Sequence, residues 1–160
     1  MNGERARELL AAVVGVTVGE GPTSADAMAG KLAPVVAHVA TEHWRDAAQF
    51  VRDTLGCAFF SFATVIDWKA DGLEVIAWVD NLETGLSVQL RTKLGPGHTV
   101  CPSLVPVYRG ANWMERESYD MFGVRFDGHP DLRRILLADD WEGHPLLKSY
   151  AVDTPHPPYR

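Results

Sequence analysis

Three carboxylates and two histidines near the end of the chain are the side chains that could do chemistry. Glu115, Glu117 and Asp120 lie close together, and His129 and His144 each occupy a Gly-His-Pro tripeptide. Paired carboxylates can act as general acid and general base, and imidazole is a common metal ligand. These residues therefore raise two candidate chemistries, acid–base catalysis and metal binding.

The rest of the sequence completes neither chemistry. Acid–base catalysis needs a pocket and a companion group, and no motif indicates either of them. The two histidines lack a third ligand at a recognisable spacing. Gly-His-Pro also builds turns, since proline fixes φ and the histidine can contact a carbonyl. We therefore favour turns at His129 and His144, and keep a free-standing acid–base enzyme built on Glu117, Asp120 and these histidines as the alternative.

Motifs for a bound cofactor are missing from the sequence. There is no Gly-x-Gly-x-x-Gly, no phosphate loop and no Gly-x-Ser-x-Gly. Cys57 and Cys101 are the only cysteines, and no Cys-x-x-Cys offers a zinc or iron–sulfur site. We expect the chain to bind no cofactor or metal and to bury both thiols, with a Cys57–Cys101 disulfide as the open alternative.

Length and charge limit the class of protein. The 160 residues predict one soluble domain, long enough to bury roughly 70% of its unfolded surface. The formal net charge of −6 and the lack of a basic run argue against nucleic acid or an anionic membrane surface as a partner.

The carboxylates lie on a helix predicted over Trp113–Phe122. Asn112 can cap this helix, with Glu115 as the capping-box partner, and Gly123 stands where a C′ glycine ends a helix. The other two acids share one face at i,i+3 spacing. Large apolar residues flank the charges, which suggests a surface that another protein covers. The residues by themselves nevertheless favour the alternative, an ordinary amphipathic helix with a solvated acidic face.

The elements that position this helix are predicted upstream. Thr41 caps a helix that Gly56 ends. A strand at Val100–Tyr108 would be an edge strand at best, because two prolines interrupt it. The apolar face of the Thr41 helix is formed by Trp44, Ala47, Ala48, Val51 and Leu55. Four further apolar runs read as strands: 35–39, 59–67, 73–81 and 86–94.

The two ends of the chain differ in character. Residues 6–13 have the spacing of an amphipathic helix ending near Gly15, followed by a loop over Gly19–Ser24. A secretory signal peptide is the alternative there, although acidic residues interleave with its arginines. After Gly123 no periodicity indicates another element, and the last dozen residues, with three prolines, look like an extended tail.

The order of elements predicts an α+β fold. We expect a two-layer sandwich with a mostly antiparallel or mixed sheet and an extended C-terminal arm. Residues 1–110 would form the α+β core domain, 111–150 the helix and an irregular partner-binding segment, and 151–160 a proline-rich tail. A structureless segment this long is unusual in a self-contained domain, so we expect it to lie on a partner.

Charges of both signs crowd the segment after the helix. Arg125, Arg133, Arg134 and Lys148 stand among five acidic residues, which predicts ion pairs within the chain or to a partner. Arginines beside aromatic residues such as Phe126 and Trp141 are typical of interface anchors.

Residues 111–150, ANWMERESYDMFGVRFDGHPDLRRILLADDWEGHPLLKSY, closely resemble the signature region of the thirty-kilodalton subunit of respiratory complex I. The Glu-Arg-Glu, Tyr-Asp-Met-Phe-Gly, His-Pro-x-Leu-x-Arg-Ile and second Gly-His-Pro-Leu follow the order and spacing of the family. Weaker agreement extends upstream to Asp67-Trp68 and Pro102-Ser103-Leu104. Leu147 and Ser149 depart from the family pattern, which has Arg and Asp there.

The resemblance implies a non-catalytic structural subunit in the hydrophilic arm of a proton-pumping NADH:quinone oxidoreductase. Members of this family carry no cofactor, while FMN and iron–sulfur clusters are expected in partner subunits. They pack on the quinone-site subunit and on cluster-bearing neighbours. They lie at the cytoplasmic face of the cell membrane and contact the membrane only through the complex. The equivalent subunit of a membrane-bound hydrogenase or another donor:quinone complex remains an alternative.

The resemblance and the charge-rich helix together indicate a set of partner-interface residues. We expect Arg134→Ala or Glu117→Ala to weaken assembly rather than change any intrinsic activity. The predicted interface residues are Trp113, Glu115, Arg116, Glu117, Asp120, Phe122, His129, Arg133, Arg134 and His144.

Overall fold

A computed structural model describes residues 3–19 and 34–151. The predicted Gly19–Ser24 loop and the proline-rich tail lie almost wholly outside these residues. The elements are α1 (Gly3–Ala11), β1 (Val16–Gly19), β2 (Val35–Val39), α2 (Trp44–Asp53), β3 (Phe59–Asp67), β4 (Leu73–Asn81), β5 (Leu86–Gly95), β6 (Val100–Pro102), α3 (Ala111–Phe122) and β7 (Arg125–Asp127), with short 3-10 helices at Thr41–His43 and Lys69–Asp71.

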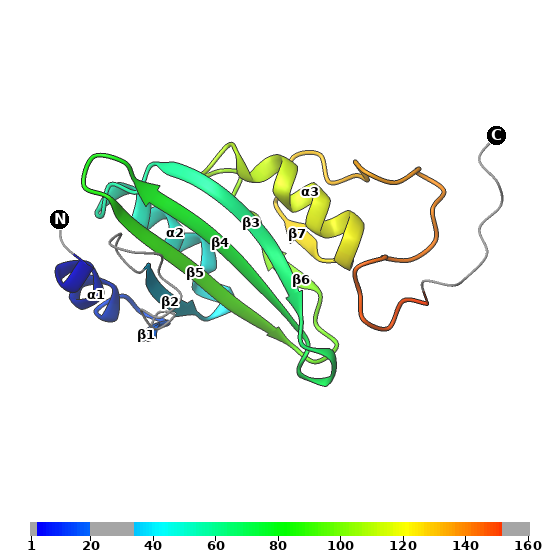
Figure 1. The fold of residues 1–160 in the computed structure, drawn as a ribbon, viewed down its shortest axis with the longest axis horizontal. Helices are drawn as coiled ribbons and strands as arrows, with labels where there is room; N and C mark the ends of the chain where they lie inside the picture. Colours follow the sequence, from blue (N-terminus) through cyan, green and yellow to red (C-terminus); the bar gives the residue numbers. More distant parts are fainter. Residues whose placement is uncertain (1–2, 20–33, 152–160) are drawn as a thin grey trace, which may run out of the picture.

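One mixed sheet organises the chain. Its strand order is β1-β2-β5-β4-β3, in which β2 and β5 are parallel and the other neighbours are antiparallel. In the view of Figure 1, α2 lies behind the sheet and α3 lies beside β3. The predicted α+β fold with a mostly antiparallel or mixed sheet is confirmed.

Burial along β5 alternates from one residue to the next. Along β5, Leu86, Val88 and Leu90 are buried while the residues between them are half-buried. The inward side chains pack against the apolar face of α2, in which Trp44, Ala47, Ala48 and Val51 are buried. Burying such side chains stabilises the fold by about 1.5–3 kcal/mol each, so this contact places α2 on the sheet.

Thr41 does not cap α2, contrary to the prediction. The 3-10 turn at Thr41–His43 comes first, and no side-chain cap bond is made to either helix. The Thr41 hydroxyl instead lies 3.0 Å from the hydroxyl of Thr92 on β5. Gly56 does follow the helix with a φ of 71°, as expected of the residue that ends it.

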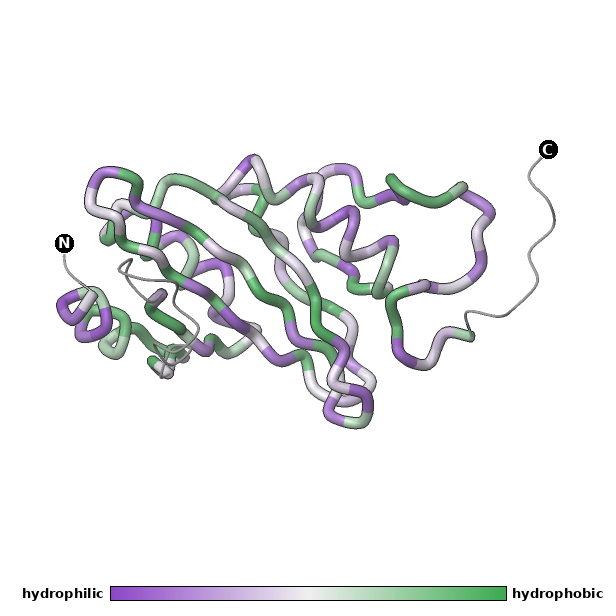
Figure 2. The backbone as a smooth tube through the Cα atoms, viewed as in Figure 1, coloured by the Kyte–Doolittle hydropathy of each residue, from purple (hydrophilic) through white to green (hydrophobic). Residues whose placement is uncertain are grey.

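The predicted edge strand at Val100–Tyr108 is only three residues long. This strand pairs in parallel with β7. The sequence did not reveal β7, because three residues are too few to display a period. After β7, residues 128–150, here called the arm, contain turns and bends and run past α3 (Figure 1). Figure 2 shows polar and apolar stretches alternating along the arm.

Candidate partner interface on α3 and the arm

Asp120 is the centre of the contact between α3 and the arm. Its side chain is fully buried, and one carboxylate oxygen accepts a 2.5 Å hydrogen bond from the Arg134 guanidinium. The other oxygen accepts the backbone N–H groups of Ile135, Leu136 and Leu137 at 3.1, 2.8 and 3.0 Å. Burial alone would raise the pKa of Asp120, but these four donors outweigh it and hold the pKa below its usual range.

Arg134 and His144 are residues of the arm that contact the last turn of α3 with their side chains. Arg134 also donates to the carbonyls of Trp141 and Gly143 at 2.9 and 3.0 Å. His144 Nδ1 lies 2.9 Å from the Asp120 carbonyl at the end of α3. The arm is therefore folded back on itself and tied to the last turn of the helix.

Glu115 does not complete a capping box. The N-cap of α3 is Gly110, without a side-chain cap bond, and Asn112 lies inside the helix. The buried Glu115 carboxylate accepts 2.6 Å hydrogen bonds from the Ser103 hydroxyl and the Leu104 N–H. Burial raises its pKa to about 7, against the opposing effect of these two donors. The predicted cap fails because Ser103 and Leu104 recruit the carboxylate instead.

The histidines contact carbonyls of α3, which agrees with the turn interpretation. His129 Nε2 lies 3.2 Å from the Asn112 carbonyl, while its Nδ1 accepts the Asp131 N–H at 3.0 Å. His144 makes the Asp120 contact described above. Across residues 3–19 and 34–151, no group of three or more His, Cys, Asp or Glu side chains is placed to hold a metal ion.

The predicted interface residues fall into three groups by exposure. Glu115 and Asp120 are buried, so a solvated acidic face is wrong for both of them. Trp113, Glu117 and Arg133 are exposed. The half-buried residues are Arg116, Phe122, His129, Arg134 and His144.

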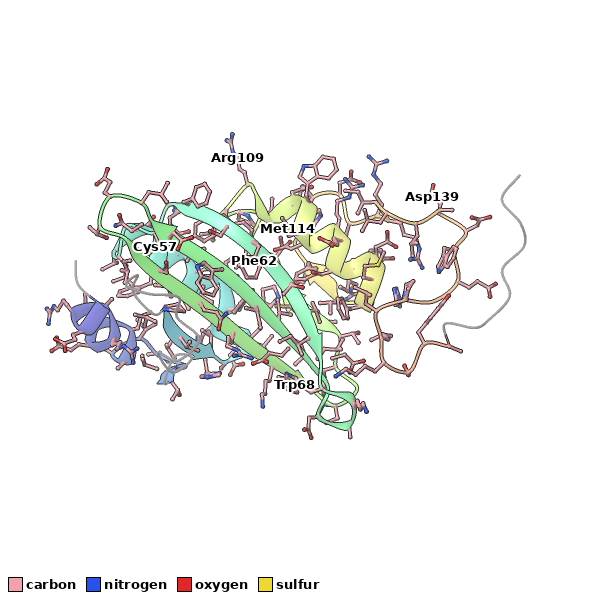
Figure 3. The ribbon with its side chains drawn as sticks, viewed as in Figure 1. Cys57, Phe62, Trp68, Arg109, Met114 and Asp139 are labelled. Atoms are coloured by element: carbon pink, nitrogen blue, oxygen red, sulfur yellow. The ribbon has the colours of Figure 1, made fainter. Side chains whose placement is uncertain are left out.

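Exposed apolar side chains lie around this contact. Trp113 is 63% exposed, and the Arg116 guanidinium lies 5.5 Å from the centre of its ring. Leu136 and Leu146 of the arm are 60% and 53% exposed, and Trp68 at the tip of the β3–β4 turn is 45% exposed (Figure 3). Phe126, by contrast, is buried in the core, so its predicted role as an interface anchor is wrong.

Ion pairs within the chain account for several of the crowded charges. Arg133 lies 3.0 Å from Asp131, and Arg134 pairs with Asp120. Arg116 donates to the carbonyls of Arg133 and Arg134 at 3.3 and 3.2 Å. Two of the four cations, Arg133 and Arg134, therefore make the expected ion pairs within the chain.

Two residues outside the predicted set also hold this region together. Asp67 accepts the Lys148 N–H at 2.7 Å, and Ser103 supports Glu115. The sequence offered two signals: Asp67 is a carboxylate just before Trp68 in a predicted turn, and Ser103 is a polar residue in the apolar run before α3. Neither signal indicates which distant group is contacted.

Both thiols are free and buried, as predicted, so the alternative disulfide is wrong. Burial, and then the charge of Asp80, raise the pKa of Cys57 to about 12. Burial also raises the pKa of Cys101. Neither thiol is therefore activated as a nucleophile.

Comparison with known proteins gives concordant matches. A family profile described as the 30 Kd subunit of respiratory-chain NADH dehydrogenase matches residues 37–156. A subunit of the NADH-quinone oxidoreductase of Chlorobium phaeobacteroides is 42% identical over 118 residues, covering 70% of each chain. The subunit of the same name from Rhodobacter capsulatus is 39% identical over 79% of this chain and 64% of the relative. That of Salinispora tropica is 39% identical, but the match spans only 49% of its length.

Solved structures share the fold at low sequence identity. A trypsin-resistant fragment of Nqo5 (1–134) has a TM-score of 0.68 at 22% identity, covering 82% of this chain and all of the fragment. A chain of the membrane-bound sulfane sulfur reductase, an archaeal respiratory membrane complex, has a TM-score of 0.72 at 21% identity, covering 93% of this chain and 85% of that one.

Proposed function

The chain belongs to the family of the 30 kDa subunit of respiratory-chain NADH dehydrogenase, and from this premise we propose that it is a structural subunit with no active site of its own. It would serve in the hydrophilic arm of a proton-pumping NADH:quinone oxidoreductase. Its role would be positional, because electron transfer and quinone binding need neighbouring subunits held in register.

The observation that carries this proposal is that α3 and the arm bond their buried carboxylates within the chain while they leave large apolar side chains exposed. Buried charges are satisfied inside the chain, Asp120 by four donors and Glu115 by two. Large apolar side chains, above all Trp113, remain exposed on the same region. Exposed apolar surface beside a satisfied polar network is typical of a docking surface.

The partners would be the quinone-site subunit and the cluster-bearing subunits, and FMN and the iron–sulfur clusters would be held by such partners. Asp139 lies on the outer stretch of the arm (Figure 3), and Asp139, Asp140 and Glu142 are all exposed, so the facing surface should be basic. No helix in the described residues is long and apolar enough to cross a membrane. We infer that membrane contact at the cytoplasmic face is made only through the complex.

The domain division follows from the same proposal. Residues 1–110 would form the α+β core domain, 111–150 the helix and the partner-binding segment, and 151–160 a proline-rich tail. The shared fold with the sulfane sulfur reductase chain keeps a related membrane complex with another electron donor as the second candidate. An acid–base enzyme built on Glu117, Asp120 and the two histidines has less support, because Asp120 and both histidines are already engaged within the chain.

A tagged pull-down from gently solubilised native membranes tests the proposal. The wild-type chain should recover quinone-site and cluster-bearing subunits, and the donor module recovered with them identifies the complex. Trp113→Ser should lower recovery about tenfold, since tryptophan is enriched among interface hot spots. Leu82→Ser, which alters another exposed apolar residue, on the β4–β5 turn, is the control.

The charged residues of the interface provide a second comparison. Arg134→Ala and Glu117→Ala should also weaken assembly, the first by freeing the arm and the second at the surface. Recovery of the wild-type chain alone, soluble and monodisperse, would overturn the proposal. Normal assembly with reduced turnover in these variants would argue for a catalytic role instead.

A further inference from the structure

Asp67 joins two segments that lie far apart in the sequence. It ends β3, where its side chain is buried. One carboxylate oxygen accepts the Lys69 N–H at 2.7 Å, which makes an Asx turn, and the other accepts the Lys148 N–H at 2.7 Å. The hydrogen bonds from Lys148 and Lys69 hold the pKa of Asp67 below its usual range. The acceptor is therefore ionised at neutral pH.

The contact with Asp67 differs from the other attachments of the arm. His144 and Leu146 are tied to the end of α3, through the carbonyls of Asp120 and Met121. Lys148 is tied to the sheet, through the β3–β4 turn. Between them, Leu147 packs against the core, which gives the family departure at this position an apolar contact. The end of the arm thus bridges α3 and the sheet.

We propose that Asp67 is a positioning residue that latches the end of the arm to the β3–β4 turn. The latch joins the end of the arm, next to the exposed Leu146, to the turn that carries the exposed Trp68. Its importance for docking rests on the proposed function, whereas the latch itself is a property of the chain alone. A charge-assisted hydrogen bond that an ionised carboxylate accepts is strong enough to decide where a segment without regular structure lies.

Two of the arm's attachments each lie at a different trypsin site. Asp120 holds the backbone just after Arg134, and Asp67 holds the backbone at Lys148. Trypsin cleaves after arginine and lysine, and cleavage of a transiently opened segment follows the population of the open form. A solved structure of this fold is itself a trypsin-resistant fragment, so this protease is a suitable probe.

The variant Asp67→Asn removes the latch and keeps the turn. The amide oxygen can still accept the Lys69 N–H, but the amide nitrogen is a donor and cannot accept the Lys148 N–H. We expect cleavage after Lys148 to accelerate about tenfold in the full-length chain, with cleavage after Arg134 unchanged. Asp120→Asn should show the opposite pattern. Asp71→Asn, which alters an exposed acid of the same turn, should behave as wild type.

Cleavage after Arg91, in the middle of β5, reports global unfolding and should stay negligible in all the variants. Equal cleavage after Lys148 in wild type and Asp67→Asn, with Arg91 uncut, would overturn the latch. So would acceleration at both arm sites together in Asp67→Asn. The pull-down of the wild-type chain tests the proposed function separately, so failure of one idea is distinguishable from failure of the other.

Discussion

At the scale of single residues, two buried carboxylates on one helix have opposite ionisation behaviour. Asp120 receives a guanidinium and three backbone N–H groups, which outweigh burial and lower its pKa. Glu115 receives one hydroxyl and one N–H, and burial raises its pKa to about 7. The number of donors that the tertiary structure supplies decides which effect prevails.

Glu115 predicts a specific dependence of stability on pH. Its folded pKa of about 7 exceeds its ordinary value of 4.5, so its contribution is fully present below 4.5 and is lost as pH rises through 7. Relative to Glu115→Gln, the free energy of unfolding of the wild type should fall by on the order of 3 kcal/mol over this range. Urea unfolding of both proteins at several pH values measures this difference in the free energy of unfolding. Glu117→Gln, at an exposed position, should run parallel to wild type, and parallel curves for Glu115→Gln would contradict the argument.

At the scale of elements, the sequence predicts one end of α3 correctly and the other end wrongly. The C-terminal end is as predicted, with Gly123 in the left-handed region donating to the Tyr119 carbonyl. That signal is local, because it depends on the backbone of one residue. The predicted capping box at the N-terminal end is wrong, because the Glu115 side chain accepts a hydrogen bond from Ser103, which lies before the helix in the sequence.

Two glycines with the same φ allow the cost of a positive φ to be distinguished from the cost of a steric clash. Gly97 and Gly123 both have a φ of 75°. A Cβ at Gly97 would meet nothing within 4 Å, whereas at Gly123 it would lie 2.7 Å from the His144 ring. Gly97→Ala should destabilise by about 1 kcal/mol, and Gly123→Ala by about 1–3 kcal/mol more, because His144 must leave the Asp120 carbonyl. Denaturant unfolding compares them, and equal losses would mean that His144 moves freely.

At the scale of the whole molecule, the arm sets the character of the proposed interface. The chain has a net charge of −6, and part of it is concentrated at Asp139, Asp140 and Glu142 on the outer stretch of the arm. Such a distribution steers association with a basic surface and disfavours acidic partners.

This distribution predicts that docking depends on salt. Combining Asp139→Asn, Asp140→Asn and Glu142→Gln should lower recovery of partner subunits several-fold at low ionic strength. It should also flatten the decline in recovery that added salt causes in the wild type, because exposed charges are screened within about 10 Å at 0.1 M salt. The pull-down repeated at two salt concentrations measures both effects. Neutralising Asp53 and Glu83, exposed acids at the end of α2 and on the β4–β5 turn, is the control. An unchanged salt response in the triple variant would contradict a basic partner surface.

The sequence alone determined the features that depend on neighbours along the chain. The strands at 35–39, 59–67 and 73–81 have the predicted bounds, because a run of apolar residues between turn residues is a local property of the chain. The family also followed from the sequence, since its signature is a run of spaced motifs within residues 111–150. The family profile confirms this assignment.

Only the tertiary structure decided what the polar side chains do. The burial of Glu115 and Asp120, the pairing of β6 with β7 and the contact of Asp67 with Lys148 each join segments separated along the chain. No local pattern encodes such contacts. A carboxylate accepts whichever donors the packed core brings to it, and that choice is made when the sheet, α3 and the arm come together.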